Sequence, residues 1–120
     1  MYKLLLSEIF FKDKDTKDIV RSCFHKSEDN FLDFLEIYLQ NFDIYKKIRL
    51  GKGLFKMDVR FPESNKGSRK SSRIIVACIQ LENILIPVKV YRKAKRENIL
   101  KNELLEVLDA ILFEYKKQQL

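Results

Sequence analysis

The spacing of apolar residues changes once along the chain, and this change constrains the fold more than any other feature. Between residues 16 and 42 apolar side chains recur every three or four positions, which is the spacing of amphipathic helices. From residue 54 to residue 91 they alternate with polar residues or form short continuous runs, which is typical of strands. A second helical pattern occupies the end of the chain. The order of these patterns predicts an α+β domain.

The first half of the chain is predicted to form one short strand, over residues 2–6, and two helices. Residues 12–15 are expected to be a polar loop, after which Thr16 caps the first helix and Ser27 caps the second. The apolar faces are Ile19, Val20, Cys23 and Phe24 in the first helix, and Phe31, Phe34, Leu35, Tyr38 and Leu39 in the second. Residues 46–53 are expected to be a basic connection without regular structure.

The second half is predicted to form three strands and a last helix. Alternation over residues 54–61 puts Leu54, Lys56, Asp58 and Arg60 on a charged face. Residues 73–80 are mostly apolar, so we expect this strand to be central, and Pro87 indicates an edge position or a bulge in the next strand. The predicted order is β-α-α-β-β-β-α, a small antiparallel-rich sheet packed by helices in a single domain over residues 1–120.

Several functional classes are disfavoured by composition. The two cysteines, Cys23 and Cys78, are far apart and accompanied by one histidine, which predicts neither a zinc site nor a disulfide framework. We found no common catalytic or nucleotide-binding motif, and we expect His25 to end a helix rather than to act in catalysis. The apolar runs are too short to span a bilayer, and no signal peptide is evident. We therefore expect a cytoplasmic protein without a cofactor.

The net charge of +7 is concentrated in two stretches of the chain. Residues 46–73 hold ten Lys and Arg side chains against two acids, and residues 89–96 hold five against none. The rest of the chain is acidic, with a sum of −6. A basic stripe on an acidic body is typical of proteins that bind a polyanion. The alternative is a basic surface that has no partner.

Four cations are expected to meet at one end of the sheet. Lys56 and Arg60 flank Asp58 on one strand. Hairpin pairing of the last two strands would bring Arg73, which opens one of them, close to Lys93, which follows the other. Such a cluster suits phosphate, because the guanidinium fork matches phosphate oxygens. RNA supplies its own 2′-OH nucleophile, so such a protein could cleave RNA by orienting that hydroxyl, neutralising the phosphate and moving protons.

Three segments of the sequence also match the pattern of one known family. They are residues 53–61, residues 67–75 with Arg73 before an apolar run, and residues 90–99 with Tyr91, Lys93, Glu97 and Asn98. In these segments, and in the order of its predicted elements, the chain resembles the RelE/HigB-like toxin superfamily.

The resemblance implies a RelE-like fold and the toxin of a type II toxin-antitoxin system, a metal-independent endoribonuclease that cleaves mRNA on the ribosome by 2′-OH attack. It also implies a cognate antitoxin, often a helix-turn-helix DNA-binding protein. By position it assigns catalysis to Lys56, Arg60, Arg73 and Lys93, with the arginines holding the phosphate and Lys56 or Lys93 transferring protons. The residues expected to bind RNA around them are Lys52, Lys66, Arg69, Lys70, Tyr91, Arg92, Lys95 and Arg96.

The chain departs from the family pattern at several positions. Residues 70–72 replace a small glycine stretch, residues 76–77 replace an aromatic pair, and Asp58 puts an acid among the cations. Tyr115 is expected in the core rather than stacked on a base. These departures keep other hypotheses open. They are a non-catalytic RNA-binding module, an inactive toxin homologue, and a protein-interaction domain whose basic groove receives an acidic segment.

Overall fold

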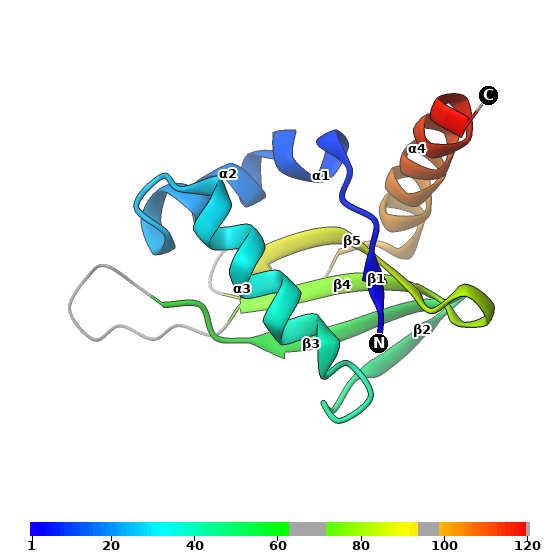
Figure 1. The fold of residues 1–120 in the computed structure, drawn as a ribbon, viewed down its shortest axis with the longest axis horizontal. Coiled ribbons are helices and arrows are strands. Elements are labelled where there is room, and N and C mark those ends of the chain that lie inside the picture. The colour runs from blue at the N-terminus through cyan, green and yellow to red at the C-terminus, as the bar shows by residue number, and fades with distance from the viewer. Residues whose placement is uncertain (63–71, 94–98, 120) are drawn as a thin grey trace.

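The computed structural model describes residues 1–62, 72–93 and 99–119 (Figure 1). Within these ranges the chain forms four helices and a five-stranded sheet, which confirms the α+β prediction. The helices are α1 (Glu8–Lys12), α2 (Lys14–Cys23), α3 (Glu28–Gln40) and α4 (Lys101–Gln119). The strands are β1 (Lys3–Leu4), β2 (Ile48–Gly51), β3 (Leu54–Val59), β4 (Ser72–Ile79) and β5 (Ile84–Arg92).

The strands follow the order β1-β5-β4-β3-β2 across the sheet. β1 runs parallel to β5, and the other neighbouring strands are antiparallel. The central position of β4 confirms the prediction from its apolar sequence. The expectation of an irregular connection over residues 46–53 is wrong in part, because β2 forms an edge strand against β3. β2 is short, and Ile48 in it is 56% exposed, so it lacks the alternation that marks a half-buried strand.

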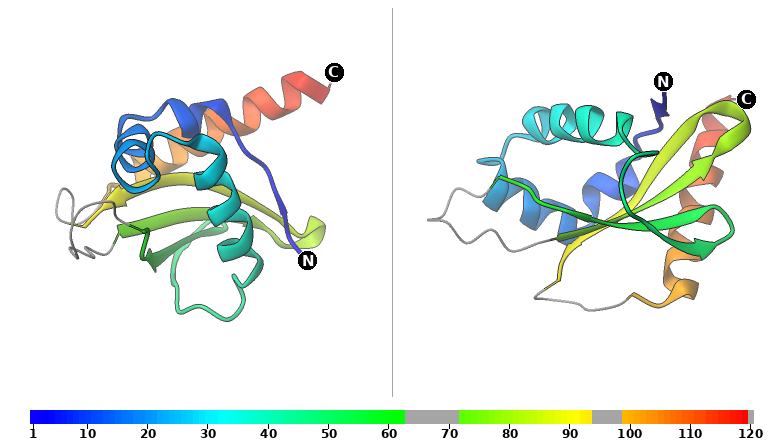
Figure 2. Two further views of the ribbon diagram at one scale, coloured as in Figure 1. Left: turned by 60° about the vertical axis from the view of Figure 1, so that its left-hand side comes forward. Right: turned by 90° about the horizontal axis from the view of Figure 1, so that it is seen from below.

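Successive residues of β4 face opposite sides of the sheet and contribute to two separate cores. Ile74 and Val76 pack with residues of α2 and α3, whereas Ile75 and Ala77 pack with residues of α4. Figure 2 shows α3 and α4 on opposite sides of the sheet. The face that carries α4 is only partly covered, and its uncovered part is where the charged side chains of β3 lie.

The burial of Leu54 shows how far α4 covers this face of the sheet. The alternation of β3 placed Leu54 on a charged face, but it is fully buried in the core beside α4, so that part of the prediction is wrong. Lys56 and Asp58 share its face, and they are half-buried and exposed respectively. The helix thus covers the beginning of β3 and leaves its end open.

The start of α2 also differs from the prediction. Asp13, rather than Thr16, caps this helix, and its carboxylate accepts a hydrogen bond from the backbone N–H of Asp15 at 3.0 Å. The expected polar loop over residues 12–15 is therefore wrong, because these residues end α1 and begin α2. Thr16 is fully buried inside α2. Ser27 does cap α3, as predicted.

Pro87 lies at a bulge. β5 lies between β1 and β4, but β1 pairs only with Ile84 and Leu85, so Pro87 lies where that side of β5 has no paired strand among the described residues. The register of β5 against β4 shifts at this point, because Val76 is opposite Pro87 whereas Ile75 is opposite Lys89. Val88 is thus the extra residue of the bulge, and the bulge alternative is confirmed.

Ion pairs tie β5 to α2. The ammonium nitrogen of Lys89 lies 2.8 Å from a carboxylate oxygen of Asp13 and 3.0 Å from one of Asp15. Nε of Arg92 lies 3.4 Å from Asp18. The side chain of Lys89 is only 12% exposed, so its charge depends on these two carboxylates.

Candidate functional site

Two cations from different strands converge on one carboxylate at the open end of β3. Asp58 is opposite Arg73 in the β3–β4 register, and Arg73 is opposite Tyr91 in the β4–β5 register. Lys93, two residues after Tyr91, therefore comes to the same end of the sheet. Oδ1 of Asp58 lies 3.0 Å from Nζ of Lys93 and 3.6 Å from Nε of Arg73. The side chain of Asp58 is 65% exposed, so solvent and ligands can reach this cluster.

A hollow of about 590 Å³ opens beside the cluster. Residues from the connection after α3 and from three strands line it, and they are Tyr45, Lys46, Lys47, Ile48, Lys56, Asp58 and Arg73. Four of them are cations and one is an acid, so the hollow is suited to an anion. The lining also includes residues that the sequence analysis did not assign to RNA binding, namely Tyr45 and Ile48.

The structure brings three of the four predicted catalytic residues together. Lys56 and Arg73 line the hollow, and Lys93 shares Asp58 with Arg73. Arg60 is exposed, follows the end of β3 and is not among the lining residues. Lys52 is also exposed, but it lies in the turn before β3, roughly 20 Å from Asp58 for six extended residues. Arg60 and Lys52 are therefore outside the cluster.

A stacked pair of tyrosines supports β3 where Asp58 emerges. The hydroxyl of Tyr38 donates a hydrogen bond to the backbone carbonyl oxygen of Asp58 at 2.6 Å. The rings of Tyr38 and Tyr45 stack with their centroids 4.5 Å apart. Burial raises the pKa of Tyr38 to about 12, with further contributions from Tyr45 and Asp58. The pair thus links α3 to the lining of the hollow, and Tyr45 presents a partly exposed aromatic ring there.

Tyr91 does not fit its predicted role in RNA binding. Its side chain is 1% exposed and belongs to the core beside α4. A base cannot stack on a ring that is covered on both faces, so the prediction is wrong for this residue. Its hydroxyl has no hydrogen-bond partner among the described residues. The sequence pattern could not distinguish packing in the core from stacking on a base, because an aromatic residue in a strand suits either role.

Arg92 is also engaged elsewhere. In addition to Asp18 its guanidinium contacts the hydroxyl of Ser22 and lies 3.7 Å from the sulfur of Cys23. These contacts direct it toward α2 and away from the hollow, so its predicted role in RNA binding is not supported. The other residues predicted to bind RNA lie outside the described ranges. They are Lys66, Arg69, Lys70, Lys95 and Arg96.

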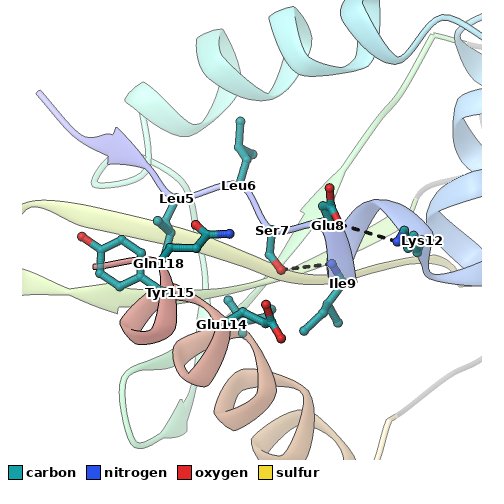
Figure 3. A pocket seen from close by; sticks show the side chains of 10 residues that line it. Leu5, Leu6, Ser7, Glu8, Ile9, Lys12, Glu114, Tyr115 and Gln118 are labelled. Atoms are coloured by element: carbon teal, nitrogen blue, oxygen red, sulfur yellow. Dashed lines mark hydrogen bonds and ion pairs between the residues drawn. The ribbon is translucent and has the colours of Figure 1, made fainter. Parts of the chain in front are cut away.

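A second hollow, of about 280 Å³, lies between the N-terminal segment and the C-terminal half of α4 (Figure 3). Its charged lining residues are Glu8, Lys12 and Glu114, and Lys12 is 3.5 Å from Glu8. Tyr115 is half-buried and lines this hollow rather than the cation cluster. The acidic balance of this second hollow makes it unsuited to phosphate.

Other chemical groups in the described residues offer little for catalysis. No cluster of three or more His, Cys, Asp and Glu side chains there could hold a metal ion. Cys23 is buried as predicted, whereas Cys78 is only half-buried, and burial raises its pKa. His25 is exposed in the turn after α2. None of the helices in the described residues has both the length and the hydrophobicity of a membrane span.

No family model matches this chain, and no curated protein matches it in sequence. The arrangement of its own residues is therefore the basis for assigning a function.

Proposed function

We propose that the protein is a metal-independent endoribonuclease, and that it acts as the toxin of a type II toxin-antitoxin system by cleaving mRNA on the ribosome. One observation carries the proposal. Arg73 and Lys93 converge on a single anionic oxygen of Asp58 at an open, cation-lined hollow. The scissile phosphate of RNA can take the position beside these cations that the carboxylate now occupies.

The cationic side chains at this hollow favour phosphate over other small anions. The planar guanidinium fork of Arg73 matches phosphate oxygens in bidentate geometry. Its side chain is 23% exposed, so it is partly desolvated and its attraction for an anion is stronger than in water. Lys93 adds a second positive charge.

The mechanism divides proton transfer between Asp58 and the lysines. The carboxylate of Asp58 accepts the proton of the RNA 2′-OH, and the 2′-oxygen then attacks the adjacent phosphorus. Arg73 neutralises the charge that builds on the phosphate oxygens. The bond to the 5′-oxygen breaks, and Lys56 or Lys93 donates the proton that this leaving group needs. The products are a 2′,3′-cyclic phosphate and a 5′-hydroxyl, and no outside nucleophile is consumed.

The hollow also suggests how substrate and inhibitor are accommodated. Tyr45 offers a partly exposed ring on which a base next to the cut can stack, and Lys46 lies next to it for a neighbouring phosphate. An antitoxin, such as a helix-turn-helix DNA-binding protein with an acidic segment, would neutralise the enzyme by placing carboxylates on Arg73 and Lys93.

Mapping of mRNA cuts in a reconstituted translation reaction tests the proposal. We expect ribosome-dependent cuts with the wild-type chain and a loss of at least a hundredfold with Arg73→Ala and with Lys93→Ala, as is typical when a donor that stabilises the transition state is removed. Lys3→Ala, an exposed lysine on β1, is the matched control and should cleave normally. A 2′-deoxy nucleotide at the cut site should abolish cleavage.

A non-catalytic RNA-binding module is the second candidate, and Asp58 is the observation that favours it. The carboxylate partly neutralises the two cations that would hold the phosphate. This candidate predicts salt-sensitive RNA binding that depends on Arg73 but no cuts by the folded wild-type chain. Cuts that persist in both alanine variants would contradict the proposed site itself.

A further inference from the structure

The acids and the cations along α2 are placed differently, although Asp18 also pairs with Arg21 at 2.9 Å. Asp13 at its cap and Asp15 and Asp18 within it are directed to Lys89 and Arg92 of β5, and their side chains are 28%, 22% and 19% exposed. The cations of the same segment lie outward and are exposed. They are Lys12, Lys14, Lys17, Arg21 and Lys26. The sequence, which intersperses both signs over residues 12–26, hides this separation.

These cations surround two shallow hollows on the outer surface of the helix. One, of about 400 Å³, is lined by four cations and by Asp15 and Asp18. The other, of about 170 Å³, is lined by Lys17, Arg21 and Lys26 and by one acid, Glu28, so cations outnumber acids in both. Within the described part of the chain, Lys14 and Lys17 have no carboxylate at ion-pair distance. Their charge therefore remains available to a partner.

We propose that this outward face of α2, together with Lys12 and Lys26, is a second binding surface that takes the phosphate backbone of double-stranded RNA. Lys14 and Arg21 are seven residues apart, which is about 10 Å along a helix. A duplex carries one phosphate per roughly 1.7 Å of its axis, so several phosphates fall within that length. Recognition of the shape and phosphates of a duplex requires no base contact.

The surroundings of the surface favour a nucleic acid over a membrane or a protein helix. None of the large hydrophobic side chains that are exposed in the described residues belongs to α2. An amphipathic helix that enters a bilayer needs such an apolar face, and a helix docked in a groove needs apolar anchors. Phosphates need only charge, and charge is what the outward face of α2 provides.

The surface is separate from the hollow proposed for cleavage. Residues of α2 pack with Met57 and Val59, whereas Lys56 and Asp58 face the other side of the sheet. A duplex on α2 and a single strand in the hollow could therefore be bound together. The choice of RNA over DNA rests on the proposed function, but the existence of the surface does not.

Binding of a fluorescently labelled RNA duplex measures the contribution of the surface. The test variant is Lys12→Gln/Lys14→Gln/Lys17→Gln, and the matched control is Lys3→Gln/Lys116→Gln/Lys117→Gln, which removes the same charge from exposed positions elsewhere. We expect the test variant to bind at least tenfold more weakly than the control. The slope of log affinity against log salt should fall by about 2 to 3, because each phosphate contact contributes about 0.9.

Equal weakening in the two triple variants would overturn the proposal, because net charge and not position would then explain it. Tighter binding of a DNA duplex than of an RNA duplex would overturn the assignment to RNA. If the nuclease proposal fails, the wild-type chain will not cut mRNA. If the proposal for α2 fails, only the measurements of RNA-duplex binding will differ from those expected.

Discussion

Two groups of ion pairs use the same residue types but leave their cations differently engaged. Where α2 meets β5, three acids, Asp13, Asp15 and Asp18, face Lys89 and Arg92. At the open end of β3 a single acid, Asp58, faces Arg73 and Lys93. The first group has more acids than β5 cations, and its side chains are little exposed. The second group has more cations than acids, and its carboxylate is exposed to solvent.

The contrast shows that the number of partners decides what a cation can do. Arg92 and Lys93 are consecutive, yet Arg92 is held by Asp18 and Ser22 whereas Lys93 shares one exposed carboxylate. A cation that is fully satisfied by the protein contributes to stability. A cation that shares its partner can exchange that partner for a ligand.

Removal of the shared acid should have the largest effect on the open group. Asp58→Asn keeps the shape of the side chain but cannot accept the 2′-OH proton, so we expect cleavage to fall by a factor of about 10² or more. RNA binding should strengthen several-fold, because a negative charge next to the phosphate is lost. Comparison of single-turnover cleavage with equilibrium binding measures both effects.

Asp58→Glu is the matched control, since it retains a carboxylate and should retain part of the cleavage. Normal cleavage by Asp58→Asn would show that a lysine, rather than Asp58, accepts the proton. Weaker binding by that variant would instead show that Asp58 serves to position Arg73 and Lys93.

Replacement of Lys89 or of Lys93 by methionine compares the two groups of ion pairs directly. Lys89→Met leaves two carboxylates close together without their cation, and we expect the free energy of unfolding to fall by about 2 kcal/mol. Lys93→Met should change it by about 0.5 kcal/mol or less, because the partner of Lys93 is exposed. Urea denaturation measures both values, and equal losses would contradict the division into two groups.

Tyr38→Phe should have a smaller effect than Lys89→Met, and this effect should depend on pH. The hydrogen bond to the Asp58 carbonyl is lost, which costs about 1 kcal/mol at neutral pH. Because the pKa of Tyr38 rises from 10.0 to about 12 on folding, its neutral form stabilises the fold fully below pH 10, and this contribution is lost as the pH rises toward 12. The difference in unfolding free energy between wild type and variant should therefore narrow above pH 10. A constant difference up to pH 12 would contradict the raised pKa.

Features of the fold with strong local periodicity could be predicted from the sequence. The apolar face of α2, the cap of α3 at Ser27 and the central place of β4 all depend on spacings within one segment. β2 could not be predicted in the same way, because an edge strand with exposed residues has no apolar alternation. The burial of Leu54 depends on how far α4 reaches over the sheet, which no pattern within β3 contains.

The candidate site could be predicted where it depends on strand pairing. Arg73 and Lys93 come together because a hairpin joins β4 and β5, and the sequence indicates that hairpin. The direction of Arg92 could not be predicted, because it depends on Ser22, seventy positions away in the sequence, and on Asp18. Tyr45 was missed as a site residue because it lies in a connection, where the sequence gives no sign of which surface it joins.

The bulge at Val88 has a consequence for the way the β4–β5 hairpin forms. Pairing can start locally at the turn after Ile79 and extend toward the other end of the strands. If the ladder continued without the extra residue, Lys89 would be opposite Ile74 and would enter the apolar core that α2 and α3 cover, instead of sharing the face of Ile75 and reaching Asp13 and Asp15. A buried, unpaired ammonium is costly, so the slipped hairpin is unstable as soon as the helices close on it. The cost of burying Lys89 thus destabilises the slipped register before folding is complete.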